Sequence, residues 1–469
     1  MKALLLAGLS LAAAAAPSIP AADKAAGARA DVALRRAFGG RYDGAQPHYV
    51  AEVTARVAAQ SGVAGGGEAF TVTLLDSPVE NAFALPGGYV YVTRQLLALM
   101  NSEAQLASVM GHEVGHVVAR HEAGRRRAAT VARLLGRLVA ALAGDDAAGA
   151  LVGLVARTAG TLYPLQYARD QEFAADGLGV RYMTTAGYSP FAAATMLAQL
   201  DASATLAARL AGRDVDAVPA WSATHPNGRE RVRRAARLAT ETRGSAAPAG
   251  QDVAFLRRLD GLRYDEAPAD GVVEGQTFRH PGLRVRLTAP QGYKLTRFGR
   301  AVHVAGSGGV ARFARTIQTK DPMVALAARL KSIGLNGSAA ATRGVAAGLP
   351  FAAVTVPARA DGRALDLTIL AYRLSATTVR LDIVTPRGTG AGAFRPLIDS
   401  VAPMTAAEAA AVPGRRLRIV TVAPGDTIET LAARMAYPSF RRERFLALNG
   451  LPADATLVPG MLVKVVVAG

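Results

Sequence analysis

Apolar side chains recur with helical spacing over much of the first half of the chain. Residues 48–60 have an amphipathic pattern that predicts a helix, and a longer helix is predicted to begin near Ser102. Gln105 follows Ser102 by three positions, a spacing typical of a capping box. The apolar positions of the longer helix are Leu106, Met110, Val114, Val117 and Val118.

Strand-like alternation in this half is confined to two stretches, at 69–76 and within 84–93, where it follows Pro-Gly-Gly. Another helix is predicted over 168–184, and further helix extends to Thr240. The pattern predicts a mainly α domain with a small β-sheet at residues 23–245, and a linker follows it at 241–252.

From about residue 275 the pattern changes to short strands. Strands are predicted at 283–287, 301–304, 310–317, 351–356, 364–373 and 377–385, with helices at 321–333 and 393–401. This order favours a separate α+β domain at 253–403, whose role the sequence leaves open. Residues 404–416 read as a second linker, and a small domain at 417–469 closes the chain. The chain is therefore expected to be multidomain.

Composition excludes several classes of protein. Hydrophobic residues make up 51% of the 469 positions and charged residues 19%, so a mostly disordered chain is excluded. The net charge is +18, but the arginines are spread along the chain with few interleaved aromatic residues, and we expect no nucleic-acid partner. The chain has no cysteine, which excludes disulfides, thiolate metal sites and cysteine nucleophiles.

Two apolar segments raise the question of a membrane. Residues 1–22 have a basic start and a short apolar run, typical of a signal peptide, which predicts export to a periplasm; the alternative is an Ala-rich helix. Residues 128–163 are apolar but carry arginines, which argues against a membrane span. Packing on the catalytic core and peripheral contact with a membrane remain the two alternatives for this segment.

The clearest chemical signal is the run His112-Glu113-Val-Gly-His116. On a helix, positions i and i+4 point the same way, so both imidazoles can bind one Zn²⁺ and leave Glu113 beside the open position. The metal would acidify water and polarise a carbonyl, and Glu113 would act as general base and acid. The alternative is two histidines on a solvated helix face.

His121 is a weaker candidate. It lies five residues beyond His116, about 140° around a straight helix, so it cannot reach the same metal while the helix continues. A metzincin would have glycine and histidine where this chain has Ala119 and Glu122, which excludes that class. We expect His121 to be a surface residue or to lie in a second layer behind the ligands.

Residues 169–179 read Arg-Asp-Gln-Glu-Phe-Ala-Ala-Asp-Gly-Leu-Gly. This run resembles the R-x-x-E-x-x-A-D-x-x-G motif of the HtpX-like and CAAX-prenyl-endopeptidase gluzincins, a family of zinc metallopeptidases. The resemblance implies that Glu172 is the third zinc ligand and that Asp176 steadies a ligand histidine. One departure is Ala168, where the family often has a serine.

Three further segments are similar to the family. Residues 81–94 resemble the stretch before its zinc helix, which implies a strand that pairs with substrate. Residues 186–190 and 224–232 resemble its soluble periplasmic BepA-like branch. The last segment makes His225 a candidate fourth ligand that closes the site or a hydrogen-bond donor to the transition state. It makes Arg231 a candidate for oxyanion stabilisation or for anchoring its helix; capping and packing are the alternatives for both.

The end of the chain resembles a LysM domain, a β-α-α-β unit that binds N-acetylglucosamine chains. The resemblance rests on Pro-Gly-Asp-Thr at 424–427, Leu-Asn-Gly at 448–450 and Pro-Gly at 459–460. It implies peptidoglycan as a partner, and a scaffold without glycan affinity is the alternative. The remaining histidines, His48, His280 and His303, are expected to be structural.

These features together predict an exported, periplasmic zinc metalloendopeptidase, associated with the wall or membrane and holding one Zn²⁺ per chain. Its expected substrates are unfolded or misassembled envelope proteins, hydrolysed with Glu113 as general base. The alternative is an envelope chaperone or cell-wall-binding adaptor with a self-inhibited zinc site. A peptidoglycan peptidase is a weaker third reading.

Overall fold

The structure is a computed structural model of the chain. It describes residues 16–121, 167–210, 225, 228–242, 251–298, 301–315, 319–333, 340–360, 363–375 and 377–469. The segment 128–163 lies outside the described residues, as do residues 1–15 of the predicted signal peptide and most of the linker at 241–252. Within the described ranges, no helix is both long enough and apolar enough to cross a bilayer.

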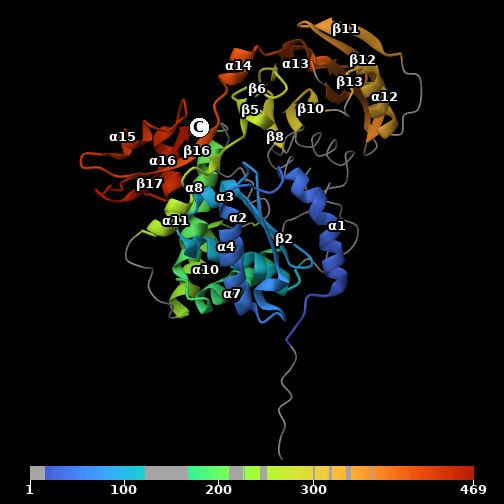
Figure 1. Cartoon of the computed structure of the whole chain (residues 1–469). Helices are drawn as coiled ribbons and strands as arrows, with labels where there is room; N and C mark the ends of the chain where they lie inside the picture. The colour runs from blue at the N-terminus through green and yellow to red at the C-terminus, as the bar shows by residue number, and fades with distance from the viewer. Residues whose placement is uncertain are drawn as a thin grey trace, which may run out of the picture.

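The first part of the chain is a helical assembly around a three-stranded sheet (Figure 1). Its helices are α1 (Ala21–Ala37), α2 (Gln46–Ala58), α3 (Arg94–Leu99), α4 (Glu103–Val118), α7 (Arg169–Thr185), α8 (Phe191–Leu210) and α10 (Gly228–Glu241). The strands β1 (Thr71–Leu75), β2 (Ala82–Leu85) and β3 (Tyr89–Thr93) pair in the order β1-β3-β2, which leaves β2 at an edge. Within the described residues, the helices and strands predicted for this part are confirmed, with small shifts of their ends; residues 211–224 of the predicted further helix lie outside them.

The start of α4 differs in one detail from the predicted capping box. Ser102 Oγ accepts a hydrogen bond from Gln105 N at 3.2 Å, as expected. The side chain of Gln105 does not return to Ser102, because its Oε1 accepts from Asn101 N at 2.6 Å instead. The first turn of α4 is thereby tied to the segment that joins it to α3.

Glycines allow α4 and α7 to pack closely. Gly111 on α4 faces Gly179 on α7, and a Cβ added to Gly179 would lie 2.8 Å from the backbone nitrogen of His112. Such a distance is too short for a carbon atom, so the contact needs a residue without a side chain. The close approach places the acidic residues of α7 beside the histidines of α4.

The middle of the chain, at the top of Figure 1, is built on two antiparallel sheets. The larger follows the order β11-β12-β13-β14-β10-β9-β8, and the smaller follows β15-β7-β6-β5. The strands of this part are β5 (Val272–Glu274), β6 (Thr277–His280), β7 (Val285–Thr288), β8 (Lys294–Phe298), β9 (Ala301–Gly306), β10 (Gly309–Arg315), β11 (Thr342–Ala346), β12 (Leu349–Ala360), β13 (Arg363–Arg373), β14 (Thr378–Pro386) and β15 (Ala402–Pro403). With α12 (Pro322–Ser332) and α13 (Arg395–Ser400), they match the predicted α+β pattern.

The last part of the chain has the order β-α-α-β, and its two strands pair antiparallel. Its elements are β16 (Arg415–Thr421), α15 (Ile428–Ala432), α16 (Arg441–Asn449) and β17 (Leu462–Ala468). We call residues 415–468 the C-terminal module. The short strand β4 (Arg263–Tyr264) extends its sheet, and α11 (Val253–Arg258) contacts β17. Residues 253–264 thus lie with the module rather than opening the α+β domain, and the expected linker 404–416 holds a short helix, α14 (Ala406–Ala410).

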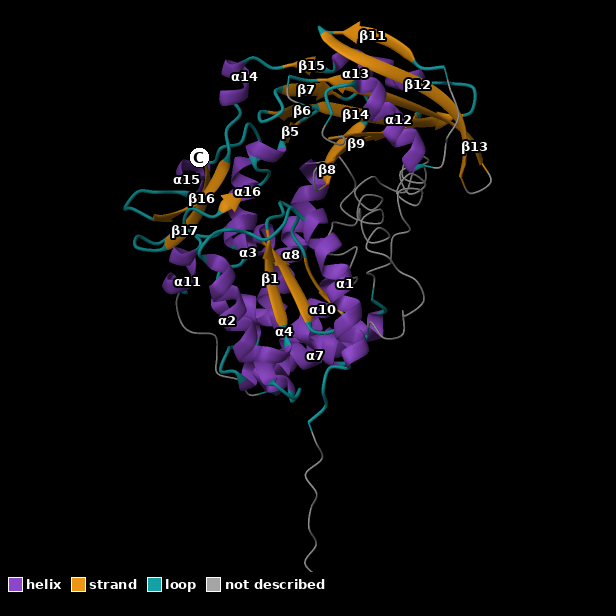
Figure 2. Ribbon diagram, turned by 45° about the vertical axis from the view of Figure 1, so that its right-hand side comes forward, coloured by secondary structure: helices purple, strands orange, loops and turns teal. Residues whose placement is uncertain are grey.

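The C-terminal module shares one hydrophobic core with the first part of the chain, beside α8 and α11 in Figures 1 and 2. Lys464 of β17 is fully buried, and its Nζ donates to the carbonyl oxygens of Ala98, Leu99 and Met100, each at 2.8 Å. Gln199 of α8 donates to carbonyls on both sides of the boundary, those of Leu99, Ala447 and Leu448. The module therefore packs on the segment that leads into α4.

Candidate metal centre

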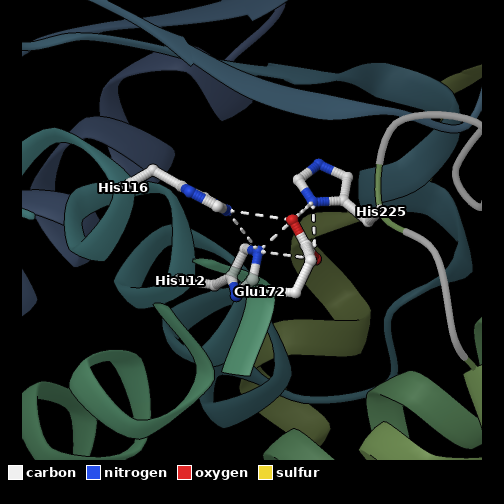
Figure 3. Close-up of side chains that lie close together, drawn as sticks. All are labelled: His112, His116, Glu172 and His225. Carbon is white, nitrogen blue, oxygen red and sulfur yellow. Dashed lines mark hydrogen bonds and ion pairs between the residues drawn. The ribbon is translucent and has the colours of Figure 1, made fainter. Parts of the chain in front are cut away.

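Four polar side chains converge between α4, α7 and the segment before α10 (Figure 3). His112 and His116 extend from α4 one turn apart, Glu172 comes from α7, and His225 lies three residues before α10. All four are buried, and one nitrogen or oxygen atom of each lies within 4.8 Å of those of the others. The structure thus brings together the three residues expected to bind the metal and His225, and the other candidate, Arg231, contacts Glu172 from behind.

The distances in this cluster fit a tetrahedral zinc ion. Nε2 of His112 lies 3.0 Å from Nε2 of His116 and 3.6 Å from Oε2 of Glu172. Nε2 of His116 lies 3.3 Å from Oε1 of Glu172. Bonds of 2.0–2.1 Å to a tetrahedral zinc ion hold neighbouring ligand atoms about 3.3 Å apart. Two imidazoles and a carboxylate are also a donor set that zinc accepts, so these residues fit the ion.

Asp176 and Arg231 support this cluster from behind. Asp176 Oδ1 lies 2.9 Å from Nδ1 of His112, so the carboxylate accepts the ring proton and leaves Nε2 directed at the cluster. Arg231 Nη2 donates to the same oxygen at 2.6 Å, and its Nη1 lies 2.7 Å from Glu172 Oε2. Arg231 is 1% exposed, and its contacts are those of an anchor between two carboxylates.

His121 lies behind His116 because α4 ends before it, at the last apolar position of the predicted helix. The helix stops at Val118, and Arg120 adopts a left-handed backbone with φ 53°. The chain therefore turns back, and His121 Nδ1 lies 2.9 Å from Nδ1 of His116. Of the two places expected for His121, the geometry corresponds to a second layer behind a candidate ligand.

Tyr167 was not singled out in the sequence. Its ring stacks on His116 with 3.6 Å between centroids and 18° between planes, and the residue is buried. It lies two residues before the motif at 169–179, where an isolated tyrosine carries no signal that would distinguish it from a core residue.

Glu113 is enclosed beside the cluster. It is fully buried, and neither of its carboxylate oxygens has a hydrogen-bond partner among the residues that the structure describes. The nearest charged partner is His225, whose Nε2 lies 3.7 Å from Glu113 Oε1. Burial raises the pKa of the Glu113 carboxyl, against the opposing effect of His225 and His112. A carboxylate that accepts no hydrogen bond from the described residues and has a raised pKa is suited to accepting a proton.

The ionisation of the other groups matches metal ligation. Burial lowers the pKa of His116 well below its usual value, which keeps the imidazole neutral. Burial of Glu172 favours its protonated form, but the charge of His225 and hydrogen bonds with His116 and His225 outweigh it and lower the pKa. Asp176 behaves similarly: burial opposes ionisation, and Arg231 lowers the pKa of its carboxyl. The two carboxyls are therefore ionised at neutral pH.

His225 contacts the cluster directly. Its Nδ1 lies 3.0 Å from Glu172 Oε1 and 3.3 Å from His112 Nε2, the place where a fourth ligand would lie. The remaining histidines are elsewhere. His48 is exposed on α2, and His280 and His303 lie on β6 and β9, where burial lowers their pKa to about 4 and about 3.

Comparison with known proteins points to the same segment. Residues 45–239 match the model of Peptidase family M48. The chain is 32% identical over 186 residues to the Mitochondrial metalloendopeptidase OMA1 of Schizosaccharomyces pombe, covering 40% of this chain and 51% of that protein. It is 31% identical over 190 residues to the Beta-barrel assembly-enhancing protease of Escherichia coli, covering 39% and 37%.

A third relative is the Mitochondrial metalloendopeptidase OMA1 of Arabidopsis thaliana, 32% identical over 165 residues, with 35% of this chain and 30% of that protein covered. The chain thus spans about a third to a half of the length of these relatives. The residues matched by the family model include α4, α7 and His225, which carry the cluster.

Proposed function

We propose that this chain is an exported zinc metalloendopeptidase, because residues 45–239 match the model of Peptidase family M48, a family of metallopeptidases that use zinc. Its substrates would be unfolded or misassembled proteins of the cell envelope. The observation that carries the proposal is the buried cluster of His112, His116 and Glu172 beside Glu113, whose carboxylate has no hydrogen-bond partner among the described residues.

His112, His116 and Glu172 would hold the zinc ion through Nε2, Nε2 and a carboxylate oxygen. The bound ion supplies a Lewis acid that polarises the scissile carbonyl and makes water a stronger acid. Glu113 takes the proton of the attacking water and passes it to the leaving amine. Asp176 and Arg231 hold His112 and Glu172 in place, through the contacts at 2.9 Å and 2.7 Å.

The edge strand β2 supports an extended, unfolded substrate. It forms one side of the three-stranded sheet and contacts α4. A peptide that adds to such an edge is held by main-chain hydrogen bonds, with little demand on its sequence. Unfolded chains can adopt this extended form, whereas a folded domain cannot.

The C-terminal module would hold the enzyme at the cell wall as a LysM-like unit that binds peptidoglycan. Its β-α-α-β order supports this proposal, and so do two exposed loops, at 423–427 and 452–460. The middle domain would select partners. Digestion of purified sacculi tests the third reading, because released muropeptides would mean that peptidoglycan is a substrate and not an anchor.

Replacement of Glu113 with Gln tests the proposed chemistry. The amide cannot accept the proton of water, so cleavage of an unfolded casein substrate should fall at least about 100-fold. Zinc content should stay near that of the wild type, because Glu113 is not a proposed ligand. Glu52→Gln, on the exposed face of α2, is the matched control and should keep full activity. Unchanged activity of Glu113→Gln would refute the proposal.

A second candidate function rests on His225. Because its Nδ1 contacts both His112 and Glu172, the chain could act as a chaperone or wall-binding adaptor with a self-inhibited zinc site. A gated protease predicts that His225→Ala cleaves faster than the wild type. Inactivity of both forms, with retained binding of unfolded outer-membrane proteins, would favour the adaptor.

A further inference from the structure

The two candidate ligand histidines of α4 have different partners on their far nitrogens. Nδ1 of His112 contacts the carboxylate of Asp176, as the family motif implies. Nδ1 of His116 contacts Nδ1 of His121 at 2.9 Å, with 71° between the two rings. A hydrogen bond between two imidazoles needs one donor and one acceptor nitrogen. When Nε2 of His116 is turned toward a metal, its proton must be on Nδ1, and His121 is then the acceptor.

The backbone is shaped to bring His121 to this position. Arg120 has a φ of 53°, which is uncommon for a residue with a side chain. The backbone N–H of His121 donates to the carbonyl of His116 at 3.1 Å, and this bond closes the end of the helix. The turn that ends α4 thus sets the backbone position of His121, from which its ring reaches Nδ1 of His116.

The ring of His116 is held on its face as well as at its edge. Tyr167 stacks on it with 18° between the planes, so rotation of the imidazole would break the stacking. The contact with His121 then decides which nitrogen carries the proton. Together the two neighbours leave the ring one orientation and one tautomer.

We propose that His121 is a positioning residue of the zinc site, which fixes the tautomer and orientation of His116 by accepting its Nδ1–H. The inference rests on the zinc assignment of the proposed function, but not on peptide cleavage. Partners of this kind orient a ligand histidine, and their loss typically weakens metal binding about 10–100-fold. His121 itself does not touch the metal or the substrate.

Two substitutions separate the hydrogen bond from packing. His121→Phe keeps an aromatic ring of similar shape but has no acceptor. His121→Asn loses the ring, but its side-chain oxygen lies close to the position of the histidine Nδ1 and can accept the same proton. His48→Phe is the matched control, because His48 is 84% exposed on α2 and is outside the site.

The primary measurement is the zinc dissociation constant of the full chain, by competition with a chromophoric chelator. Zinc binding should weaken about 10–100-fold in His121→Phe and stay within about threefold of the wild type in His121→Asn and in the control. The visible absorption of the Co²⁺-substituted protein should change in His121→Phe and return in His121→Asn. Thermal melting of the metal-free forms shows whether each variant folds.

Wild-type affinity in His121→Phe would overturn the inference. Equal losses in the Phe and Asn variants would also overturn it, because they would mean that the imidazole ring acts only by packing. Failure of the proposed function has a different signature. In that case the wild type binds zinc without cleaving unfolded protein, and the order of affinities among the variants is unchanged.

Discussion

Lys464 offers a direct test of how the C-terminal module supports the zinc helix. Its side chain is fully buried, and the ammonium group donates to three successive carbonyls at the end of α3. Only two residues separate the last of these carbonyls, that of Met100, from Glu103 at the start of α4. Lys464→Met keeps a side chain of similar length and removes every donor.

The expected cost follows from the three carbonyls. The carbonyl of Leu99 keeps its hydrogen bond from Gln199. Each of the other two buried acceptors loses its partner at a cost of roughly 1 kcal/mol or more, so the substitution should lower the free energy of unfolding by about 2 kcal/mol. Part of this loss of stability is offset in the variant, because a charged amine is itself costly to bury. Burial accordingly lowers the pKa of Lys464 well below its usual value. The stem of methionine preserves most of the packing.

The assay is urea denaturation of the full chain, followed by circular dichroism and by release of zinc. The matched control is Lys331→Met on the exposed face of α12, which should change the free energy of unfolding by less than about 0.5 kcal/mol. A Lys464→Met protein as stable as the control would refute the reasoning. A module that unfolds in a separate step, with zinc retained, would refute it as well.

Three further outcomes are expected. Burial raises the pKa of Glu80 to about 7 from 4.5, so the folded state favours the protonated form and stability falls as pH rises through this range. Glu80→Gln should remove a fall of about 3 kcal/mol in the free energy of unfolding as pH rises. If the free energy of unfolding of the variant has the same slope between pH 5 and 8 as that of the wild type, the reasoning is contradicted. Gly179→Ala should weaken zinc binding, because its Cβ would lie 2.8 Å from His112 N. Gly177→Ala, in open space on the same helix, should not weaken it. Equal zinc affinities of the two variants in a chelator titration would contradict the packing argument. Removal of zinc with a chelator should lower the melting temperature of the wild type, measured by calorimetry, but not that of His112→Ala. An equal shift of the melting temperature in both proteins would mean that the metal binds elsewhere.

The sequence predicts the part of the site that depends on local spacing. His112 and His116 are four residues apart on a strongly patterned helix, so their common face follows from helix geometry alone. Glu172 is distant in the chain, and only the resemblance of its motif to a family indicated its place. Its meeting with the histidines depends on Gly111 and Gly179, whose importance appears once α4 and α7 are packed.

The structure adds what local patterns do not contain. A left-handed backbone conformation is usually predicted from a glycine in the sequence. The turn that places His121 has this conformation at Arg120 instead, so the sequence does not indicate it. Likewise, a lysine in a strand is ordinarily a surface residue, and nothing near Lys464 in sequence indicates the carbonyls that it binds. Both features depend on contacts between segments that the chain brings together only on folding.

The most direct test of the central claim is a crystal structure of the zinc-loaded full chain, with an anomalous difference map recorded at the zinc absorption edge. The account predicts one peak per chain, at about 2.0–2.2 Å from Nε2 of His112, Nε2 of His116 and a carboxylate oxygen of Glu172. A peak bound by other residues, or none within this cluster, would contradict it.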